Sequence, residues 1–375
     1  MRLTPASFDR AEFNAIKALI SACAGRSDID LQWIAGGALV DDARHLREGL
    51  PEPASLLPLP SGESGPAAAI AAAASGTATA LQRLRPDLLI VAGDRSELLG
   101  VVGAATTGGV PVLHVSGGEV SFGSTDELVR HALTKLSHLH AVAAAPFRDR
   151  LLQMGEEPWR VLVTGDPALD GVAAVAPPTR EELESRLAHR LTPPVVVLTW
   201  HPVTTQADPA SGVEEVLAGL VRFTGTLVIT AANRDRGGAA INRSLQRFAE
   251  TRPRTAFHAA LGSDYTALLK IADAMVGNSS SGIWEAASHR LPVVDIGSRQ
   301  EGRLAGAHVE HVPCEAAAIA AALERALDPG RRATLSDLVN PYGDGSAAPR
   351  ILDFAARTWD RRDLLKKRFI DLAPC

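Results

Sequence analysis

Residues 194–202, PVVVLTWHP, decide the fold class, because they join a buried strand to polar residues at its end. VVVLT shows no alternation of polar and apolar side chains, which is typical of a strand covered on both faces of a parallel sheet. Similar runs recur along the chain, and alanine- and leucine-rich stretches of helical length separate them. This alternation predicts an α/β protein with parallel sheets. The runs are LQWIAG, DLLIVAG, VPVLHVS, HAVAAA and RVLVTG in the first half, and PVVVLTW, TLVITA, RTAFHA, ADAMVG, LPVVDIG and HVEHV in the second.

The composition changes at residues 176–187, APPTREELESRL, where two prolines predict a hinge and a helix start. We therefore expect two doubly wound, Rossmann-like domains, residues 1–176 and 177–355, whose parallel sheets face a central cleft. The last segment, 356–375, contains WDRRDLLKKRFIDL. Its pattern predicts an amphipathic helix that packs back toward the N-terminal domain.

Composition excludes several classes of protein. The net charge of −5 gives no reason to expect nucleic acid or an anionic membrane as a partner. No apolar run is long enough for a membrane span, and MRLTPASFDRAEF lacks the apolar stretch of a signal peptide, so we expect a cytoplasmic protein. Cys23, Cys314 and Cys375 are far apart, and neither they nor the histidines have the spacing of a metal site.

Polar clusters follow the apolar runs directly, and ligands of open α/β sheets bind beyond the carboxyl ends of the strands. AGDR places Asp94 and Arg95 at such an end, SGGE places Glu119, and TWHP places His201. Asp126 opens the helical pattern DELVRH. These side chains are candidates for acid–base chemistry and binding. The alternatives are a salt-bridged turn for Asp94 and Arg95, a helix-dipole contact for Asp126, and a structural role for His201.

GNSSSGIWEA, residues 277–286, places three serines between a strand and a helical pattern. Small residues there let an anion reach the unpaired N–H groups at a helix start, so Ser279 and Ser280 are candidates for a phosphate seat. Glu285, one helical turn later, could accept hydrogen bonds from ribose hydroxyls. The alternative is that one serine is only an N-cap.

Arg10 and Arg299 are the candidate cations for phosphate oxygens, with surface ion pairs as the alternative. Carboxylates in the first half and a phosphate seat in the second suit a nucleotide sugar that lies across the cleft.

At these residues the chain resembles the UDP-N-acetylglucosamine 2-epimerase family, and specifically its hydrolysing branch, which RHALTKLSHLH distinguishes from the non-hydrolysing one. The resemblance implies a glycosyltransferase-B-like architecture, no metal or nicotinamide cofactor, a UDP-sugar substrate, and a homodimer or homotetramer. The matching segments are GDR, HVSGGE, DELVRHALTKLSH, GDPALD, HPVT, NRDRGGAAIN, GNSSSGIWEA, GSRQEGR and NPYGDG.

The resemblance also implies a reaction: loss of UDP and the C2 proton gives a 2-acetamidoglucal, and addition to the opposite face inverts C2. Asp94 and Asp126 fall on the catalytic carboxylates of the family, and we add Glu119 and His201 as catalytic candidates. The substrate-binding candidates are Arg10, Arg95, Arg130, Asn233, Ser279, Ser280, Glu285 and Arg299, while His201 also falls on a binding position.

Two positions depart from the family pattern. Ser116 replaces the glutamate that precedes the glycines in HxEGGE, and Ala38 replaces the histidine of a TGxHL loop. A serine cannot act as a carboxylate base, and losing this base would impair the addition of water. We therefore expect either UDP-N-acetylmannosamine or, if water still adds, free N-acetylmannosamine plus UDP. The alternatives are a glycosyltransferase of the same architecture and a catalytically impaired UDP-sugar-binding protein.

Overall fold

The structure is a computed structural model, and it divides into two compact units. Unit 1 comprises residues 1–119, 126–171 and 342–375, and unit 2 comprises residues 120–125 and 172–341. The domain boundary that the sequence predicts, between residues 176 and 177, lies outside the described residues, and so does Cys375. The residues that the structure describes are 1–42, 49–60, 65–122, 126–170, 172, 178–233, 235–262 and 264–371.

Unit 1 is built on a parallel sheet whose strand order, in the described residues, is β4-β3-β1-β5-β6-β7-β8, with β2 also paired to β1. Every apolar run of the first half contains a strand, whereas the edge strand β4 was not predicted. The strands are β1 (Arg2–Ser7), β2 (Asp30–Leu31), β3 (Ile34–Gly36), β4 (Ser55–Leu57), β5 (Leu88–Ala92), β6 (Val112–Val115), β7 (Leu139–Val142) and β8 (Val161–Val163).

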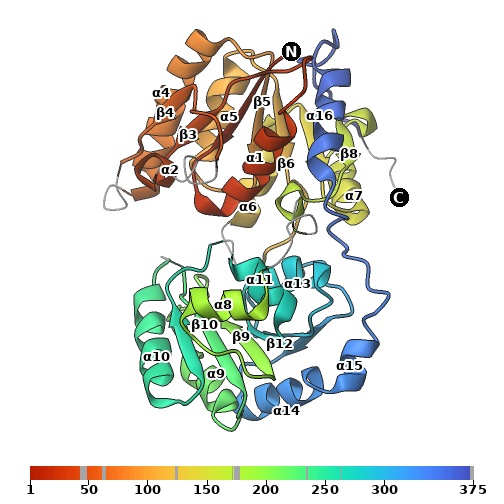
Figure 1. Cartoon of the computed structure of the whole chain (residues 1–375). Coiled ribbons are helices and arrows are strands. Elements are labelled where there is room, and N and C mark those ends of the chain that lie inside the picture. The colour runs from red at the N-terminus through yellow and green to blue at the C-terminus, as the bar shows by residue number, and fades with distance from the viewer. Residues whose placement is uncertain are drawn as a thin grey trace. The chain divides into compact units, whose positions relative to one another are not determined.

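Helices cover both faces of this sheet, which explains the unbroken apolar runs. In β5, Leu88 and Ile90 pack in a core with α1 and α16, while Leu89 and Val91 pack in a second core with α4 and α5. Figure 1 shows α16 beside α1, although they come from opposite ends of the chain. The helices of unit 1 are α1 (Arg10–Ala22), α2 (Ala38–Asp42), α4 (Gly65–Leu84), α5 (Leu98–Thr107), α6 (Asp126–Leu136), α7 (Ala145–Gln153) and α16 (Ala347–Thr358), with 3-10 turns η2 (Pro158–Arg160) and η3 (Pro167–Leu169).

Unit 2 repeats this design with a six-stranded parallel sheet in the described residues. In β9, Val196 and Leu198 pack with α9, α10 and α14, while Val195 and Val197 pack with α8 and α11 on the other face. The strands are β9 (Val195–Thr199), β10 (Thr226–Thr230), β11 (Thr255–His258), β12 (Ala274–Gly277), β13 (Val293–Ile296) and β14 (Val309–Val312). The helices are α8 (Arg180–Leu187), α9 (Val213–Leu220), α10 (Gly238–Thr251), α11 (Asp264–Ile271), α12 (Ser280–Ile283), α13 (Glu285–Ser288), α14 (Ala316–Ala326) and α15 (Pro329–Ala333).

Each sheet has a topological switch point, where the chain stops adding strands on one side of the sheet and continues on the other side. In unit 2 the order β11-β10-β9-β12-β13-β14 places this point between β9 and β12, and in unit 1 it lies between β1 and β5. Doubly wound sheets bind their ligands beyond the strand ends at such points. Gly277 is required there, because a Cβ at this residue would lie 1.9 Å from the Thr199 carbonyl oxygen.

The C-terminal segment differs from the prediction. The final helix is α16, Ala347–Thr358, and the described residues after it form turns and extended chain, so the helix predicted within 356–375 was wrong. Residues 342–355, which we expected in the C-terminal domain, belong to unit 1. None of the helices in the described part of the chain has the length and apolar character needed to span a bilayer. The predicted fold class, with parallel sheets in both domains, is confirmed.

Candidate functional site

In unit 1 the ends of β5 and β6 bring two predicted clusters together. The Gly93 N–H donates to the Val115 carbonyl over 3.1 Å, which places the loop that carries Asp94 beside Ser116. The His114 side chain also holds this loop, because its Nε2 lies 2.8 Å from the Gly93 carbonyl oxygen. Burial lowers the pKa of His114 to about 3, so its ring is neutral and donates through Nε2–H.

The guanidinium of Arg130, on α6, is the centre of this site. Its side chain is only 2% exposed, and Nη2 forms an ion pair with Asp94. Nη1 donates to the Glu119 carbonyl and to Glu127 Oε2, both over 2.9 Å. Because both terminal nitrogens are engaged by protein oxygens, Arg130 holds Asp94 and the SGGE loop in place relative to α6.

The remaining candidates of unit 1 lie around the same strand ends. Asp126 begins α6 and is half-buried, and its charge reaches the half-exposed guanidinium of Arg95. Glu119 is 8% exposed. Arg10 begins α1, but its side chain lies outside the described residues. The structure therefore gathers Asp94, Glu119 and Arg130 directly.

The sequence analysis missed Glu12, a buried acid at the β1–β5 switch point. It lies in the first turn of α1 and is 5% exposed, and neither carboxyl oxygen has a hydrogen-bond partner among the residues that the structure describes. Its side chain packs on Gly93, where a Cβ would lie 3.3 Å from Glu12 Cγ. Burial, and then the charges of Glu97, Asp9 and Asp94, raise the pKa of Glu12 well above its ordinary value.

This acid makes the stability of the protein depend on pH. Because the pKa of Glu12 is raised, the folded state binds this proton more tightly than the unfolded chain, which loses it above a pKa of about 4.3. Stability is therefore lost as pH rises from that value toward the raised pKa of the folded state.

We expect Glu12→Gln to raise the Tm at pH 8 by at least about 2 °C, with a gain that shrinks toward pH 5. Scanning calorimetry across this pH range measures it. The control is Glu181→Gln, which changes an exposed glutamate on α8. An equal gain at both pH values, or no gain, would contradict a raised pKa of Glu12.

In unit 2 the buried Asn278 joins the two strands of the switch point. Its Oδ1 accepts from the His201 N–H over 2.7 Å, and its Nδ2 donates to the His201 carbonyl over 2.9 Å. The Asn278 carbonyl accepts from Arg299 Nη1 and Gln300 Nε2 over 3.0 and 2.8 Å. One asparagine, which the sequence analysis did not select, thus holds His201 and Arg299 at one site.

His201 is a neutral hydrogen-bond donor in this arrangement. Its Nδ1 accepts from the Asn233 N–H over 3.1 Å, so the proton lies on Nε2. Burial, and then the charge of Arg299, lower the pKa of His201 to about 3. The ring can donate through Nε2–H at neutral pH but does not act as an imidazolium acid. Asn233 itself donates from Nδ2 to Asp235 over 2.6 Å.

Two of the three serines, Ser279 and Ser281, have structural roles in the turn before α12. Ser279 is the N-cap of α12, and its hydroxyl accepts from the Ser281 N–H. Ser281 is buried, and its hydroxyl lies 2.6 Å from that of Tyr265 and 2.9 Å from that of Ser279. The N-cap alternative is therefore correct for Ser279, and Ser281 anchors the turn. Ser280 is half-buried at the first position of α12.

The helix after the serines is shorter than expected. It ends at Ile283, Trp284 interrupts it, and Glu285 begins α13. Glu285 lies near the serine turn, because its charge adds to burial in raising the pKa of Tyr265.

Both departures from the family pattern lie at strand ends of unit 1. Ser116 has φ +66°, a left-handed conformation that is uncommon for a residue with a Cβ. Ala38 begins α2, and its N–H donates over 3.2 Å to the carbonyl of Phe8, which follows β1.

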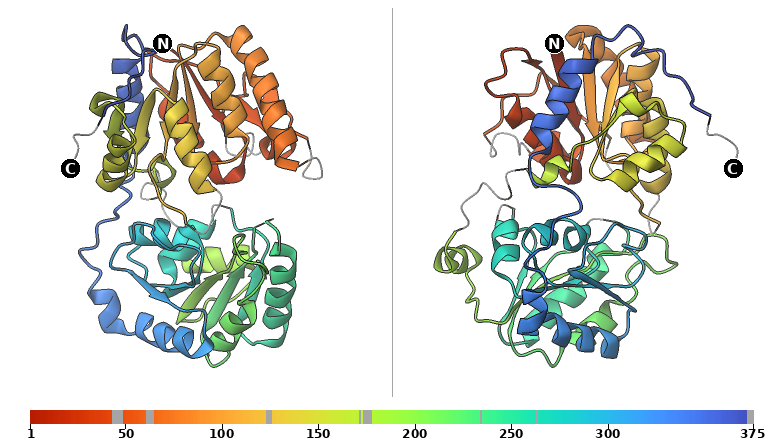
Figure 2. Two further views of the ribbon diagram at one scale, coloured as in Figure 1. Left: turned by 180° about the vertical axis from the view of Figure 1, so that it is seen from behind. Right: turned by 90° about the vertical axis from the view of Figure 1, so that its right-hand side faces the viewer.

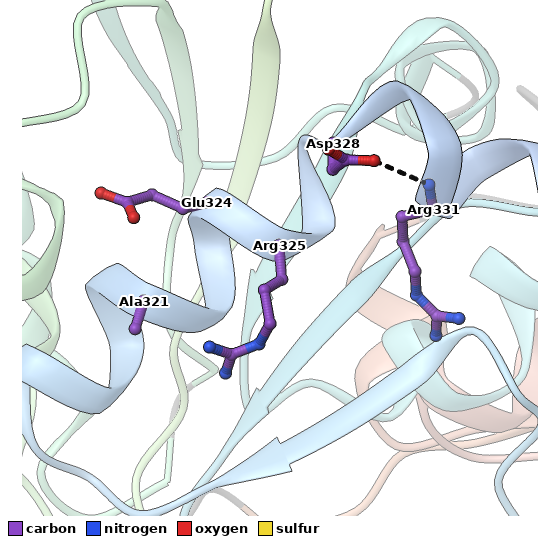
Figure 3. Close-up of a pocket in the computed structure, with 5 residues that line it drawn as sticks. All are labelled: Ala321, Glu324, Arg325, Asp328 and Arg331. Carbon is purple, nitrogen blue, oxygen red and sulfur yellow. Dashed lines mark hydrogen bonds between the residues drawn. The ribbon is translucent and has the colours of Figure 1, made fainter.

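The described residues contain no group of three His, Cys, Asp or Glu side chains arranged to hold a metal ion. A surface pocket of about 460 Å³ lies on α14 and α15, and none of the predicted site residues lines it (Figure 3). Its Arg325 pairs with Glu310, and its Arg331 donates to the Ala307 carbonyl. The arginines of this pocket are therefore already occupied.

Two doubly wound sheets with polar switch points define a glycosyltransferase-B-like protein, and solved structures share this fold. The UDP-GlcNAc 2-epimerase of Methanocaldococcus jannaschii, in complex with UDP-GlcNAc and UDP, aligns over 95% of this chain and 100% of its own with a TM-score of 0.79 at 17% identity. The enzyme of Neisseria meningitidis bound to UDP-GlcNAc aligns over 96% and 100%, with a TM-score of 0.75 at 16% identity. At such identities the likeness shows the fold.

Sequence comparison identifies the family. Residues 21–356 match the family described as UDP-N-acetylglucosamine 2-epimerase, and the chain belongs to it. The GDP/UDP-N,N'-diacetylbacillosamine 2-epimerase (hydrolyzing) of Campylobacter jejuni is 36% identical over 61% of each chain. The UDP-N,N'-diacetylbacillosamine 2-epimerase (hydrolyzing) of Legionella pneumophila is 34% identical over 71% of this chain and 69% of its own. The resemblance to the hydrolysing branch is confirmed.

Proposed function

We propose that the chain is a UDP-N-acetylglucosamine 2-epimerase that inverts C2 by eliminating UDP. The observation that carries the proposal is the division of chemistry between the units. Unit 2 offers uncharged donors and the Arg299 cation at its switch point, and unit 1 offers carboxylates around Arg130. The diphosphate rests on the first set, and the sugar faces Asp94, Glu119 and Asp126.

The chemistry suits these groups. The hydrogen on C2 is only weakly acidic, so it leaves as a proton only when the C1–O bond to UDP breaks. The electrons of the C2–H bond then form the C1=C2 double bond, and those of the C1–O bond leave with UDP. Carboxylates near C1 and C2 stabilise the positive charge and take the proton. The Nε2–H of His201, the Arg299 guanidinium and the Ser280 hydroxyl stabilise the charge on the leaving diphosphate. A well-placed donor of this kind contributes roughly 3 kcal/mol.

The remaining predicted roles are part of the same proposal. Arg95 and Arg10 bind phosphate or sugar oxygens, Asn233 binds UDP or the sugar, and Glu285 binds the ribose. Arg130 was expected to bind substrate, and because its nitrogens are engaged by protein oxygens we propose instead that it positions Asp94. The relatives named above carry hydrolysing names, which favours release of free sugar plus UDP, while Ser116 favours a product that keeps UDP. We place the enzyme in the cytoplasm as a homodimer or homotetramer.

Incubation with UDP-N-acetylglucosamine in D₂O, followed by proton NMR, tests the function. A manno product with deuterium at C2 is expected. Whether that product carries UDP distinguishes the two outcomes of the second half-reaction. Unchanged substrate with saturable binding would overturn the epimerase proposal in favour of a binding protein, and sugar transfer to an added acceptor would favour a glycosyltransferase.

Supplying the missing carboxylate should increase hydrolysis. Ser116 lies beside the Asp94 loop, so we expect Ser116→Glu to raise the yield of free sugar relative to UDP-sugar by at least about tenfold, which is less than the 10²–10⁴-fold that a well-placed acid–base group contributes. Ser116→Gln is the matched control, because it has the same size and the same left-handed backbone strain but no base. Equal yields from the two variants would rule out the missing carboxylate as the cause.

A further inference from the structure

The chain after α16 contributes a lysine to the end of helix α6. Lys367 Nζ donates to the carbonyls of Thr134, Lys135 and Ser137 over 3.0, 3.0 and 2.6 Å. It also lies 2.8 Å from Glu156 Oε2. The last carbonyls of a helix have no partner within it, and that end is partly negative, so a half-buried ammonium there satisfies both needs. Lys367 therefore replaces an ordinary helix C-cap.

The carboxylate of Glu156 links this lysine to the surrounding structure. Glu156 is 1% exposed and accepts from Lys135 over 2.7 Å. Its Oε2 lies 3.1 Å from Nε2 of the buried His140, on β7. Lys367, the end of α6 and β7 are thus joined through one carboxylate.

Three further contacts hold the segment 359–371 against unit 1 (Figure 2). Buried Arg160 donates to the Leu364 and Asp363 carbonyls over 2.8 and 3.1 Å. The Ile370 N–H donates to the Gly155 carbonyl over 3.0 Å. The Phe369 ring packs on Gly155, where a Cβ would lie 2.7 Å from it. These contacts place Lys367 in a fixed position.

We propose that Lys367 is a positioning residue of the unit 1 site, which holds the C-terminal end of α6 and through that helix places Asp126 and Arg130. The helix is rigid and about 16 Å long, so a shift of its last turn moves its first turn. Arg130 carries the shift directly to Asp94 through their ion pair. The inference rests on the proposed function, because it gives these side chains a catalytic purpose.

Lys367→Met tests the inference, with Lys366→Met as the matched control, since Lys366 is exposed one residue earlier. Glu156 keeps Lys135 and His140 as partners, so the variant should fold. We expect kcat to fall by at least about tenfold, because small displacements of catalytic groups have large effects. The KM should change by less than about twofold, because the proposed diphosphate contacts of His201, Ser280 and Arg299 lie in unit 2 and are left in place. Lys366→Met should match the wild type.

A second variant and a second measurement separate positioning from loss of folding. Phe369→Ala loosens the segment but leaves the buried charges in place, and we expect it to lower kcat by about threefold. Native-state hydrogen exchange should show faster exchange in α6 for both variants, independently of activity. Wild-type kcat and unchanged α6 exchange in both variants would overturn the inference. An inactive wild type with faster α6 exchange in the variants would instead overturn the proposed function.

Discussion

Replacing Asp94 with asparagine is expected to lower kcat by about 10²–10⁴-fold, the usual contribution of an acid–base group. The amide keeps the size of the side chain and can still accept a hydrogen bond from Arg130. It cannot take the C2 proton or stabilise positive charge at C1. Binding of UDP should remain within about twofold of the wild type, because the proposed diphosphate contacts of His201, Ser280 and Arg299 lie in unit 2 and are unchanged.

Steady-state kinetics and calorimetric titration with UDP measure the two effects separately. Asp149→Asn, which changes an exposed aspartate on α7, is the control. If Asp94→Asn kept most of its kcat, or lost UDP affinity and kcat together, Asp94 would not be the base.

Replacing Arg130 with methionine is expected to destabilise the protein by about 3–5 kcal/mol, the cost of breaking a buried ion pair from one side. The buried guanidinium is the shared partner of Asp94, Glu127 and the Glu119 carbonyl. Its removal leaves two carboxylates close together without the cation between them. Activity should fall with stability, because Asp94 loses its support.

Urea denaturation followed by circular dichroism measures the loss. The control is Arg148→Met, which changes a half-exposed arginine of α7 that pairs only with the exposed Asp149 among the contacts of the described residues. A loss no larger than that of the control would mean that water or rearranged side chains replace the guanidinium.

The fold could be predicted because burial on both sheet faces leaves a pattern in the sequence itself. Runs such as VVVLT and DLLIVA need no alternation, and polar residues follow these two runs within a few positions. β4 escaped prediction because a three-residue edge strand has too few side chains to form a pattern. The terminal segment has helical periodicity, yet its carbonyls accept from Arg160 and its N–H of Ile370 bonds to Gly155, so tertiary contacts replace the helix.

The candidate site could be predicted only in part. Strand-end placement was enough to select Asp94, His201 and Arg299. Glu12 and Asn278 were missed, because a carboxylate in a first helical turn and an asparagine beside serines both have ordinary explanations in the sequence. Their importance comes from burial and from strands that pair only in the folded chain.

The path of the chain through unit 1 determines the order in which the two halves can mature on the ribosome. Residues 172–341 emerge as one continuous stretch and can complete their core early, since domains fold as units during synthesis. Unit 1 cannot complete its core until later, because Ile351 and Leu352 of α16 belong to that core and are translated after the whole of unit 2. A nascent chain that stalls before α16 would therefore expose an unfinished apolar surface on the half that carries the carboxylates, and chaperones would meet that half first.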